Sequence, residues 1–308
     1  MMVTQDELEA LRPLLFSIAY RMLGSVTDAQ DLVQEALLRY HHAAAEGARI
    51  DSPKAYLSAI VTRLAIDQLR SARARREAYT GEWLPEPLLT GDAEDPAARA
   101  EEADTLSMAF LLVLERLSPV ERAVFLLHDV FGYGYDELAA IVGKSEANCR
   151  QIALRARRHV ESKRPRFAAS RRERDELAAR FFAAVHDGDV EALVQLLAAN
   201  VVATGDGGGK APQWATPIVG AERVARLFAG LGRQMRALGV SLEQRQVNGQ
   251  PGAVSRDPQG RVINVFVLEI ADGAIQAIRS VINPDKLHHV GPVADIRALL
   301  HTGRASRR

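Results

Sequence analysis

The stretch "YDELAAIVGKSEANCRQIALRARR", residues 135–158, decides the fold of the region around it, because it has the layout of a helix-turn-helix. Apolar residues recur at helical spacing from Leu138, Gly143 suits the turn, and Ser145 suits the N-cap of a second helix. In that second helix, apolar residues recur on one side and arginines occupy the other. The pattern predicts a helix that is packed on one face and basic on the other.

The basic face of this second helix predicts a DNA-binding surface. The start of such a helix lies in the major groove, where side chains reach base edges, whereas cations further along contact phosphates. We expect one group near base edges, namely Lys144, Ser145, Asn148, Arg150 and Gln151. We expect a second group at phosphates, namely Arg155, Arg157 and Arg158. The alternative is a structural helix whose basic face is only solvated.

The charges of the chain are segregated, although its 308 residues have a formal net charge of zero. Residues 144–166 carry eight Lys or Arg and two acidic residues, whereas residues 92–104 carry six acidic residues and one Arg. The length is typical of about two domains. The single cysteine excludes an internal disulfide framework and a thiol-rich zinc site. Neither a signal-peptide pattern nor a membrane-length apolar run is present, so we expect a cytoplasmic protein with no membrane partner.

Residues 5–77 have the pattern of three amphipathic helices, which predicts a compact helical bundle. Ser25 suits the N-cap of the second helix, and Pro53 suits the first turn of the third. Residues 105–165 are helical again and include a capping box that begins at Ser118. Two helical blocks therefore precede the C-terminal half.

Residues 78–104 separate the two helical blocks and read as a linker, because they contain three prolines and two glycines without a sustained period. The prolines of "WLPEP", residues 83–87, favour an extended segment. The apolar side chains around them are costly to expose, at ~25 cal/mol per Å² of apolar surface. We therefore expect this part of the linker to dock on a protein surface.

Residues 173–290 predict an α+β domain, and residues 291–308 form a tail. Helices are expected before an antiparallel meander of strands, over residues 173–188, 189–201 and 220–239. In "RVINVFVLEI" both alternating sets of residues are mostly apolar, which predicts a strand buried on both faces. The tripeptide "ADG", residues 271–273, suits a hairpin turn.

Residues 8–162 resemble a bacterial sigma factor of the extracytoplasmic-function class, which retains only sigma regions 2 and 4. "DAQDLVQEALLRYH", residues 28–41, is similar to region 2.2, and "SPKAYLSAIVTRLAIDQLRS", residues 52–71, is similar to regions 2.3 and 2.4. Residues 117–158 are similar to region 4. The resemblance implies that the chain binds core RNA polymerase and directs it to promoter DNA. Region 2 would act at the −10 element and region 4 at the −35 element.

The resemblance also assigns roles to two surfaces of region 2. An acidic and polar stripe is expected to bind the clamp of core RNA polymerase through Asp28, Asp31, Gln34 and Glu35. The next helix is expected to hold and open the −10 element through Tyr56, Arg63, Asp67, Arg70 and Arg73. Many relatives have Trp in place of Tyr56, so a core role for this residue stays open. A solvated helix face is the alternative for the acidic stripe.

Residues 173–290 resemble the SnoaL-like branch of the nuclear-transport-factor-2-like fold, a curved sheet that helices wrap around a cone-shaped cavity. Sigma factors with this extension, the SigJ-like group, share three motifs, and "WLPEP", "DGGGK" (206–210) and "NPDK" (283–286) are all intact here. The resemblance implies that the domain regulates the sigma regions in cis. It gives an interdomain regulatory role to Trp83, Leu84, Pro85, Asp206, Gly207, Gly208, Gly209, Lys210, Asn283, Pro284, Asp285 and Lys286.

The glycine-rich motif is not a phosphate loop, because the spacing of a Walker A motif fails at Thr204 and Ala211. In the C-terminal half, no acids, bases or metal ligands converge by spacing. We therefore expect a chain that is not an enzyme and that uses no cofactor or metal. A small-molecule ligand in the SnoaL-like cavity is left open.

Two other functions stay open. A one-component, ligand-responsive DNA-binding regulator explains the helix-turn-helix and the cavity, but not the acidic stripe or the basic helix at 63–76. An enzyme fused to a DNA-binding module needs convergent acid and base groups in the cavity. The expected fold class is multidomain: two all-α sigma domains followed by an α+β domain with a curved antiparallel sheet.

Overall fold

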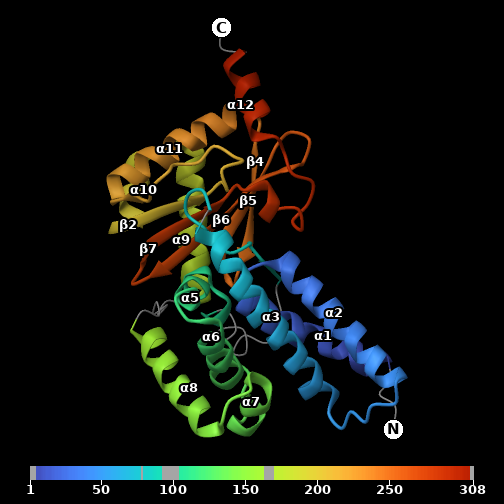
Figure 1. Cartoon of the computed structure of the whole chain (residues 1–308). Helices are drawn as coiled ribbons and strands as arrows, with labels where there is room; N and C mark the ends of the chain where they lie inside the picture. Colours follow the sequence, from blue (N-terminus) through green and yellow to red (C-terminus); the bar gives the residue numbers. More distant parts are fainter. Residues whose placement is uncertain (1–4, 78, 92–103, 163–169, 306–308) are drawn as a thin grey trace. The chain divides into compact units, whose positions relative to one another are not determined.

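The computed structural model describes residues 5–77, 79–91, 104–162 and 170–305, without the side chains of residues 72–77 and 301–305. The chain divides into two compact units (Figure 1). The first unit consists of Met1–Ala78 and Leu111–Arg164, and the second consists of Tyr79–Phe110 and Pro165–Arg308. The described part of the linker therefore belongs to the same unit as the C-terminal domain.

Three helices of the first unit pack as the predicted bundle, namely α1 (Gln5–Leu23), α2 (Val26–Ala45) and α3 (Pro53–Glu77) (Figure 1). Apolar side chains such as Leu15 and Leu57 are fully buried. Ser25 caps α2, because its Oγ accepts a hydrogen bond from the backbone N–H of Asp28 at 3.1 Å. The local start signals in the sequence therefore set the register of the helix faces.

The second helical block contains α5 (Met108–Leu114), α6 (Pro119–Phe125), a π-helical turn η1 (Leu126–Val130), α7 (Tyr135–Val142) and α8 (Glu146–Glu161). The expected capping box is present before α6. The backbone N–H of Ser118 donates to the Glu121 carboxylate at 3.0 Å, and Ser118 Oγ accepts from the backbone N–H of Glu121 at 3.3 Å. The side-chain hydrogen bond with Ser118 lowers the pKa of Glu121, which keeps the carboxylate ionised in the box.

The helices α7 and α8 form the predicted helix-turn-helix. Gly143 ends α7 in the left-handed conformation, with a φ of 66°, which suits glycine. Ser145 Oγ accepts a hydrogen bond from the backbone N–H of Asn148 at 3.3 Å and caps α8. The side of α8 predicted to be apolar is buried through Cys149, Ile152, Ala153, Ala156 and Val160. The predicted turn and the predicted inner face are confirmed.

The second unit is a curved sheet of seven strands in the order β1-β4-β5-β6-β7-β2-β3. The strands are β1 (Leu89–Thr90), β2 (Leu197–Asp206), β3 (Ile218–Val219), β4 (Ser241–Val247), β5 (Gln250–Arg256), β6 (Val262–Ala271) and β7 (Ala274–Val281). The helical elements are α9 (Arg171–Asp187), α10 (Val190–Leu196), α11 (Ala221–Ala237), the 3-10 turn η2 (Pro284–Lys286) and α12 (Ile296–Ala305).

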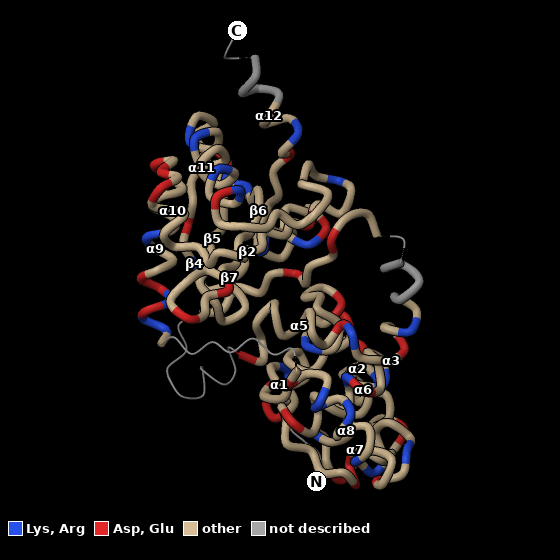
Figure 2. Tube along the Cα trace, turned by 90° about the vertical axis from the view of Figure 1, so that its left-hand side faces the viewer, with Lys and Arg blue, Asp and Glu red and all other residues tan. Residues whose placement is uncertain are grey.

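One face of the sheet packs against α9, α10 and α11 (Figure 2). Phe181 and Phe228 from the helices meet Leu268 and Ile278 from the strands in one apolar core. The predicted burial of β6 on both faces is confirmed, because nine of its ten residues are buried and Phe266 is partly buried. The "ADG" turn is also confirmed by the left-handed conformation of its last two residues between β6 and β7.

One expectation for this unit is wrong. Helix α10 ends at Leu196, and residues 197–201, which were expected to be helical, begin β2. The β-branched Val201 and Val202 favour a strand, and β2 pairs in parallel with β7, so sheet pairing outweighs the local apolar periodicity. The sequence pattern did not predict this parallel pair. It places the end of β2, and with it Asp206, beside the end of β7.

Candidate functional site

The exposed side of α8 carries the side chains predicted to recognise DNA, and Lys and Arg along the trace are drawn blue in Figure 2. Asn148 and Arg157 are partly buried, and the other predicted residues are exposed, namely Lys144, Ser145, Arg150, Gln151, Arg155 and Arg158. Leu154 lies among them with 48% of its surface exposed. The pattern of charged residues did not predict a role for this apolar side chain. An apolar side chain here suits contact with a thymine methyl group in the major groove.

Two arginines of α8 are oriented by neighbouring side chains. The Arg150 guanidinium donates to Glu146 at 2.8 Å and lies 5.1 Å from the centroid of the Tyr135 ring. Arg157 Nε donates to Asp129 Oδ1 at 2.8 Å, and this side-chain hydrogen bond raises the pKa of Arg157 above its ordinary value. The Arg150–Glu146 pair is exposed, and such pairs contribute about 0–1 kcal/mol, so a DNA phosphate can compete for Arg150 at low cost.

The acidic and polar residues predicted to bind RNA polymerase lie on one side of α2 and are exposed or partly buried, namely Asp28, Asp31, Gln34 and Glu35. The Glu35 carboxylate is 2.7 Å from the guanidinium of Arg39. Leu38, one turn beyond Gln34, is 47% exposed. The pattern of charged residues in the sequence did not indicate it. Acidic groups beside an exposed leucine suit a protein interface, whose centre is commonly apolar.

The residues predicted to hold the −10 element are distributed along α3. Asp67 and Arg70 are exposed and form an ion pair at 3.2 Å. Tyr56 is partly buried, and its ring packs edge-on against that of Tyr40, with centroids 6.1 Å apart. The side chain of Arg73 lies outside the described residues. The described candidates therefore lie on one helix without forming one cluster.

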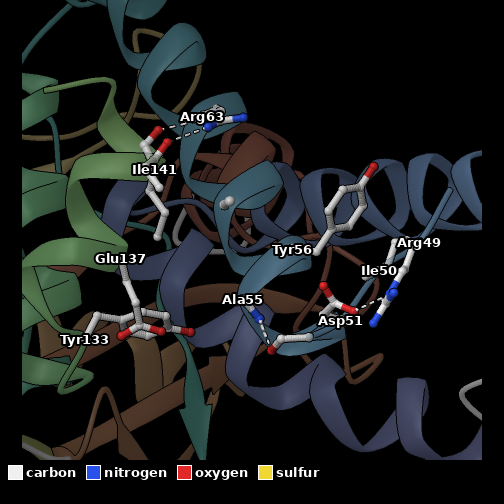
Figure 3. A pocket seen from close by; sticks show the side chains of 12 residues that line it. Arg49, Ile50, Asp51, Ala55, Tyr56, Arg63, Tyr133, Glu137 and Ile141 are labelled. Atoms are coloured by element: carbon white, nitrogen blue, oxygen red, sulfur yellow. Dashed lines mark hydrogen bonds and ion pairs between the residues drawn. The ribbon is translucent and has the colours of Figure 1, made fainter.

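Arg63, which was also expected to face DNA, is bonded to the helix-turn-helix. Its Nε donates to the carbonyl oxygen of Ile141 at 2.9 Å, and its Nη2 donates to that of Ala140 at 2.6 Å. Both carbonyls belong to the last turn of α7, where the helix offers them no partner and its dipole is negative. A pocket of about 340 Å³ lies beside this contact, and its lining also includes Tyr56, Arg49 and Asp51 (Figure 3).

Other contacts in the first unit also join the two sigma regions. The Tyr133 hydroxyl donates to Ser58 Oγ at 2.7 Å in a buried position. Arg122 is 3% exposed and donates to the carbonyl oxygen of Met22, at the end of α1, at 2.5 Å. Burial lowers the pKa of Arg122 to about 9. Sequence reasoning missed these contacts because the partners are 75 and 100 residues apart.

Asp206 is fully buried and holds the described part of the linker to the end of β2. Its Oδ1 accepts a hydrogen bond from the Tyr79 hydroxyl at 2.5 Å. Its Oδ2 accepts from the backbone N–H of Leu84 at 2.9 Å and from Lys286 Nζ at 2.7 Å. Burial, reinforced by the bond to Asp206, raises the pKa of Tyr79 well above its ordinary value, so the hydroxyl stays a donor.

Lys286 bonds both to Asp206 and to the linker. Its Nζ donates to the carbonyl oxygen of Leu84 at 2.5 Å and lies 5.0 Å and 4.4 Å from the ring centroids of Tyr79 and Trp83. A carboxylate, a carbonyl and two aromatic faces thus surround one ammonium group. We call Tyr79, Trp83, Leu84, Asp206 and Lys286 the linker clasp. It brings together the "WLPEP", "DGGGK" and "NPDK" motifs.

The glycines of "DGGGK" allow a close approach of the loop to its neighbours. A Cβ added to Gly208, whose φ is 57°, would lie 2.2 Å from the Asn283 amide, and one on Gly209 would lie 3.3 Å from Thr80. A Cβ on Gly207 would lie 2.5 Å from the carbonyl oxygen of Ala211. The motif therefore serves a tight turn packed against the linker.

The remaining motif residues differ in burial. Lys210 and Asp285 form an ion pair at 2.5 Å in which both side chains are more than half exposed. Pro85 is buried beside the clasp residue Leu84, and Pro284 begins η2. An exposed ion pair of this kind contributes little to stability.

Two residues outside the motifs also hold the linker, and sequence reasoning missed them. Asn248 is fully buried, and its amide accepts from the backbone N–H of Leu88 and donates to the carbonyl of Leu106, both at 3.0 Å. His289 Nε2 is 2.7 Å from the carbonyl oxygen of Pro87. The dipeptide "NG" at 248–249 is typical of a turn, and a turn is present there. The dipeptide does not indicate that Asn248 also binds the linker.

The described residues contain no group of three or more His, Cys, Asp or Glu arranged to hold a metal ion. Within the same part of the chain, none of the helices combines the length and the apolar character that crossing a bilayer requires.

Three family models match the chain in the order in which the domains occur. Residues 8–75 match Sigma-70 region 2, residues 107–160 match Sigma-70, region 4, and residues 178–278 match the SnoaL-like domain. The matched segments contain α2, the helix-turn-helix and the core of the second unit, respectively.

Curated relatives and a solved structure extend this similarity to most of the chain. The chain is 40% identical to the ECF RNA polymerase sigma factor SigJ of Mycobacterium tuberculosis, over 91% of this chain and 92% of that protein. It is 32% identical to the probable ECF RNA polymerase sigma factor SigI of the same organism, over 90% and 92%. The crystal structure of the M. tuberculosis extracytoplasmic function sigma factor SigJ aligns with a TM-score of 0.72 and 36% identity, over 94% of this chain and 100% of that chain.

Proposed function

Because the chain belongs to the family of extracytoplasmic-function RNA polymerase sigma factors, we propose that α2 binds core RNA polymerase, α3 holds the −10 element and α8 reads the −35 element. The observation that carries this proposal is the pairing of two different surfaces on one compact unit. One is the acidic face of α2 with Leu38, and the other is the basic face of α8. A sigma factor needs both, since it bridges a protein and DNA.

At the −35 element, the start of α8 supplies base contacts and its later turns supply phosphate contacts. Asn148, Arg150 and Gln151 lie in the first two turns of α8, where helix-turn-helix proteins reach base edges. Arg155 and Arg158 are exposed one and two turns later. The Arg150–Glu146 pair must open or shift for Arg150 to reach a guanine.

We expect the double substitution Arg155→Ala and Arg158→Ala to weaken duplex binding without changing which sequence is preferred. Each lost phosphate contact reduces the slope of log affinity against log salt by about 0.9. Fluorescence anisotropy with labelled promoter duplexes at several salt concentrations measures both the affinity and the slope. Arg172→Ala is the control, since this arginine on α9 forms an exposed ion pair with Glu176 and lies outside α8. A changed sequence preference with an unchanged salt slope contradicts the assignment.

The C-terminal domain regulates the sigma regions in cis by holding the linker through the clasp. This role is supported by the burial of Asp206 and by the hydrogen bonds that its carboxylate accepts from Tyr79, Leu84 and Lys286. A linker that is fixed along one stretch limits the distance between regions 2 and 4. Those regions must fit a promoter whose −10 and −35 elements have a set spacing.

Transcription from purified core polymerase tests this function and its regulation together. We expect the full-length chain to support promoter-dependent run-off transcription, and we expect truncation after residue 170 and Asp206→Asn to change the output in the same direction, since both release the linker. Glu222→Gln, which removes a carboxylate from the exposed Arg226 pair, is the control and should leave the output as it is. A full-length chain that binds promoter DNA but is not retained by core polymerase would instead favour a one-component regulator.

The SnoaL-like domain is also proposed to bind a small molecule. On the helix-covered face of the sheet, Asn264 Oδ1 and Trp214 Nε1 are buried, and neither has a hydrogen-bond partner among the described residues. A small molecule that carries both a hydrogen-bond donor and an acceptor would suit these atoms, because the amide oxygen accepts and the indole N–H donates.

A further inference from the structure

One face at the start of α3 carries small and polar residues at helical spacing. We call it the α3 face and define it as Ser52, which precedes the helix, together with Ala55, Tyr56, Ala59 and Arg63. The two alanines leave room, so this face forms one wall of the pocket of about 340 Å³ (Figure 3). The opposite wall comes from region 4 and includes Tyr133, Glu137 and Ile141.

We infer that the α3 face binds two partners in turn: helix α7 of the same chain and an unpaired DNA strand. When one is bound, the other is excluded. The identity of the strand as the −10 element rests on the proposed function, whereas the competition itself rests on the contacts of the α3 face.

The contacts with α7 use the groups that a DNA strand needs. Arg63 directs its Nε and Nη2 at the carbonyls of Ile141 and Ala140. These two N–H groups form the edge with which a guanidinium binds phosphate in bidentate fashion. Arg63 therefore cannot cap α7 and bind a phosphate with this edge at the same time.

The rest of the α3 face suits an unpaired nucleotide. The partly buried ring of Tyr56 offers a stacking surface at the pocket, and Arg49, 90% exposed at its side chain, supplies a second cation. The pocket volume of about 340 Å³ exceeds that of one base. With α7 in place, Tyr133 and Ile141 line the pocket from the region 4 side (Figure 3).

Reciprocity between the two partners makes the competition measurable. If α7 and unpaired DNA exclude each other, any change that loosens α7 tightens DNA binding by the same factor, as long as the docked state predominates. Duplex DNA bound by α8 is not expected to compete, because no residue of α8 lines the pocket.

The experiment weakens the α7 contact at a residue outside the α3 face. Tyr133→Phe removes the hydroxyl that donates to the buried Ser58 and keeps the ring. Dyes on His41→Cys and Glu161→Cys, both exposed, report the distance between α2 and α8 in the full chain, and the native Cys149 is buried and stays unlabelled. The probes are a 12-nucleotide single-stranded DNA pool of randomised sequence and a duplex of the same length.

We expect single-stranded DNA, but not duplex DNA, to lower the energy transfer. We expect Tyr133→Phe to bind the single strand about fivefold more tightly, the factor that one ordinary hydrogen bond represents. Tyr135→Phe is the matched control, since this ring packs on His128 and Arg150 within region 4, and its energy transfer and affinity should equal those of the unmodified chain.

Two results would overturn the inference: single-stranded binding that leaves the energy transfer unchanged, or a folded Tyr133→Phe chain whose affinity equals that of Tyr135→Phe. The inference is also wrong if the chain does not bind the single strand at 100 times the concentration that saturates its duplex site. Run-off transcription with core polymerase tests the proposed function separately from the competition at the α3 face. A chain that shows the competition but yields no transcript contradicts the function alone.

Discussion

Asp206→Asn is expected to lower the free energy of unfolding of the second unit by ~3–5 kcal/mol, the usual cost of leaving one partner of a buried ion pair unpaired. The substitution preserves the shape of the side chain. It removes the charge that faces Lys286 Nζ at 2.7 Å, in a site where Asp206 is fully buried and Lys286 is 8% exposed. The carbonyl of Leu84 and the rings of Tyr79 and Trp83 carry no formal charge that could replace that of Asp206.

Urea unfolding followed by tryptophan fluorescence measures this effect, because both tryptophans of the chain, Trp83 and Trp214, belong to the second unit. Trp83 also reports release of the linker, since its ring faces Lys286 at 4.4 Å. We expect a red-shifted emission at urea concentrations below the main transition.

A double-mutant cycle isolates the pair from other effects of the substitution. The double variant Asp206→Asn and Lys286→Met should recover part of the lost stability, because it leaves no unpaired charge. Glu222→Gln, in an exposed ion pair with Arg226, should change the stability by less than ~1 kcal/mol. Strictly additive single effects would show that the carboxylate and the ammonium group do not interact, and would remove the basis for the clasp.

The helices of the first unit could be predicted because their start signals are local. Ser25, Ser118 and Ser145 each cap a helix within three residues, and the apolar face follows from the spacing of the residues after the cap. Strand β2 was missed because its identity depends on a partner more than 70 residues away in β7. Local periodicity does not contain that information.

The candidate surfaces could be located from the sequence, but the residues that contact them within the folded chain could not. The basic residues of α8 are on the exposed side of that helix, since a helical period divides its residues into two faces. The sequence alone could not show that Arg63 caps α7, because the contact joins residues 78 and 77 apart and depends on how two helical blocks pack. The same holds for Asn248, which binds the linker residue Leu88 from a turn 160 residues further along the chain.

The substitutions Asp31→Lys and Glu35→Lys together are expected to abolish retention by core RNA polymerase at concentrations that saturate the unmodified chain. The proposed partner surface on the clamp is basic, so each reversal replaces an attraction with a repulsion. Losing close charge pairs at a protein interface costs ~2–5 kcal/mol, which is at least about 30-fold in affinity. The exposed Leu38 lies one turn beyond Gln34, and Leu38→Ser should lower affinity without changing its salt dependence.

Anisotropy of a dye-labelled chain titrated with core polymerase measures this loss, and Glu46→Lys is the matched control. Glu46 is exposed at the C-cap of α2, beyond the acidic stripe, so its reversal changes the net charge by the same amount per residue. Duplex binding by α8 should persist in all variants, which separates a lost polymerase contact from a lost fold. If the Lys variants bind core polymerase as tightly as Glu46→Lys does, the acidic stripe is a solvated face and the polymerase contact lies elsewhere on region 2.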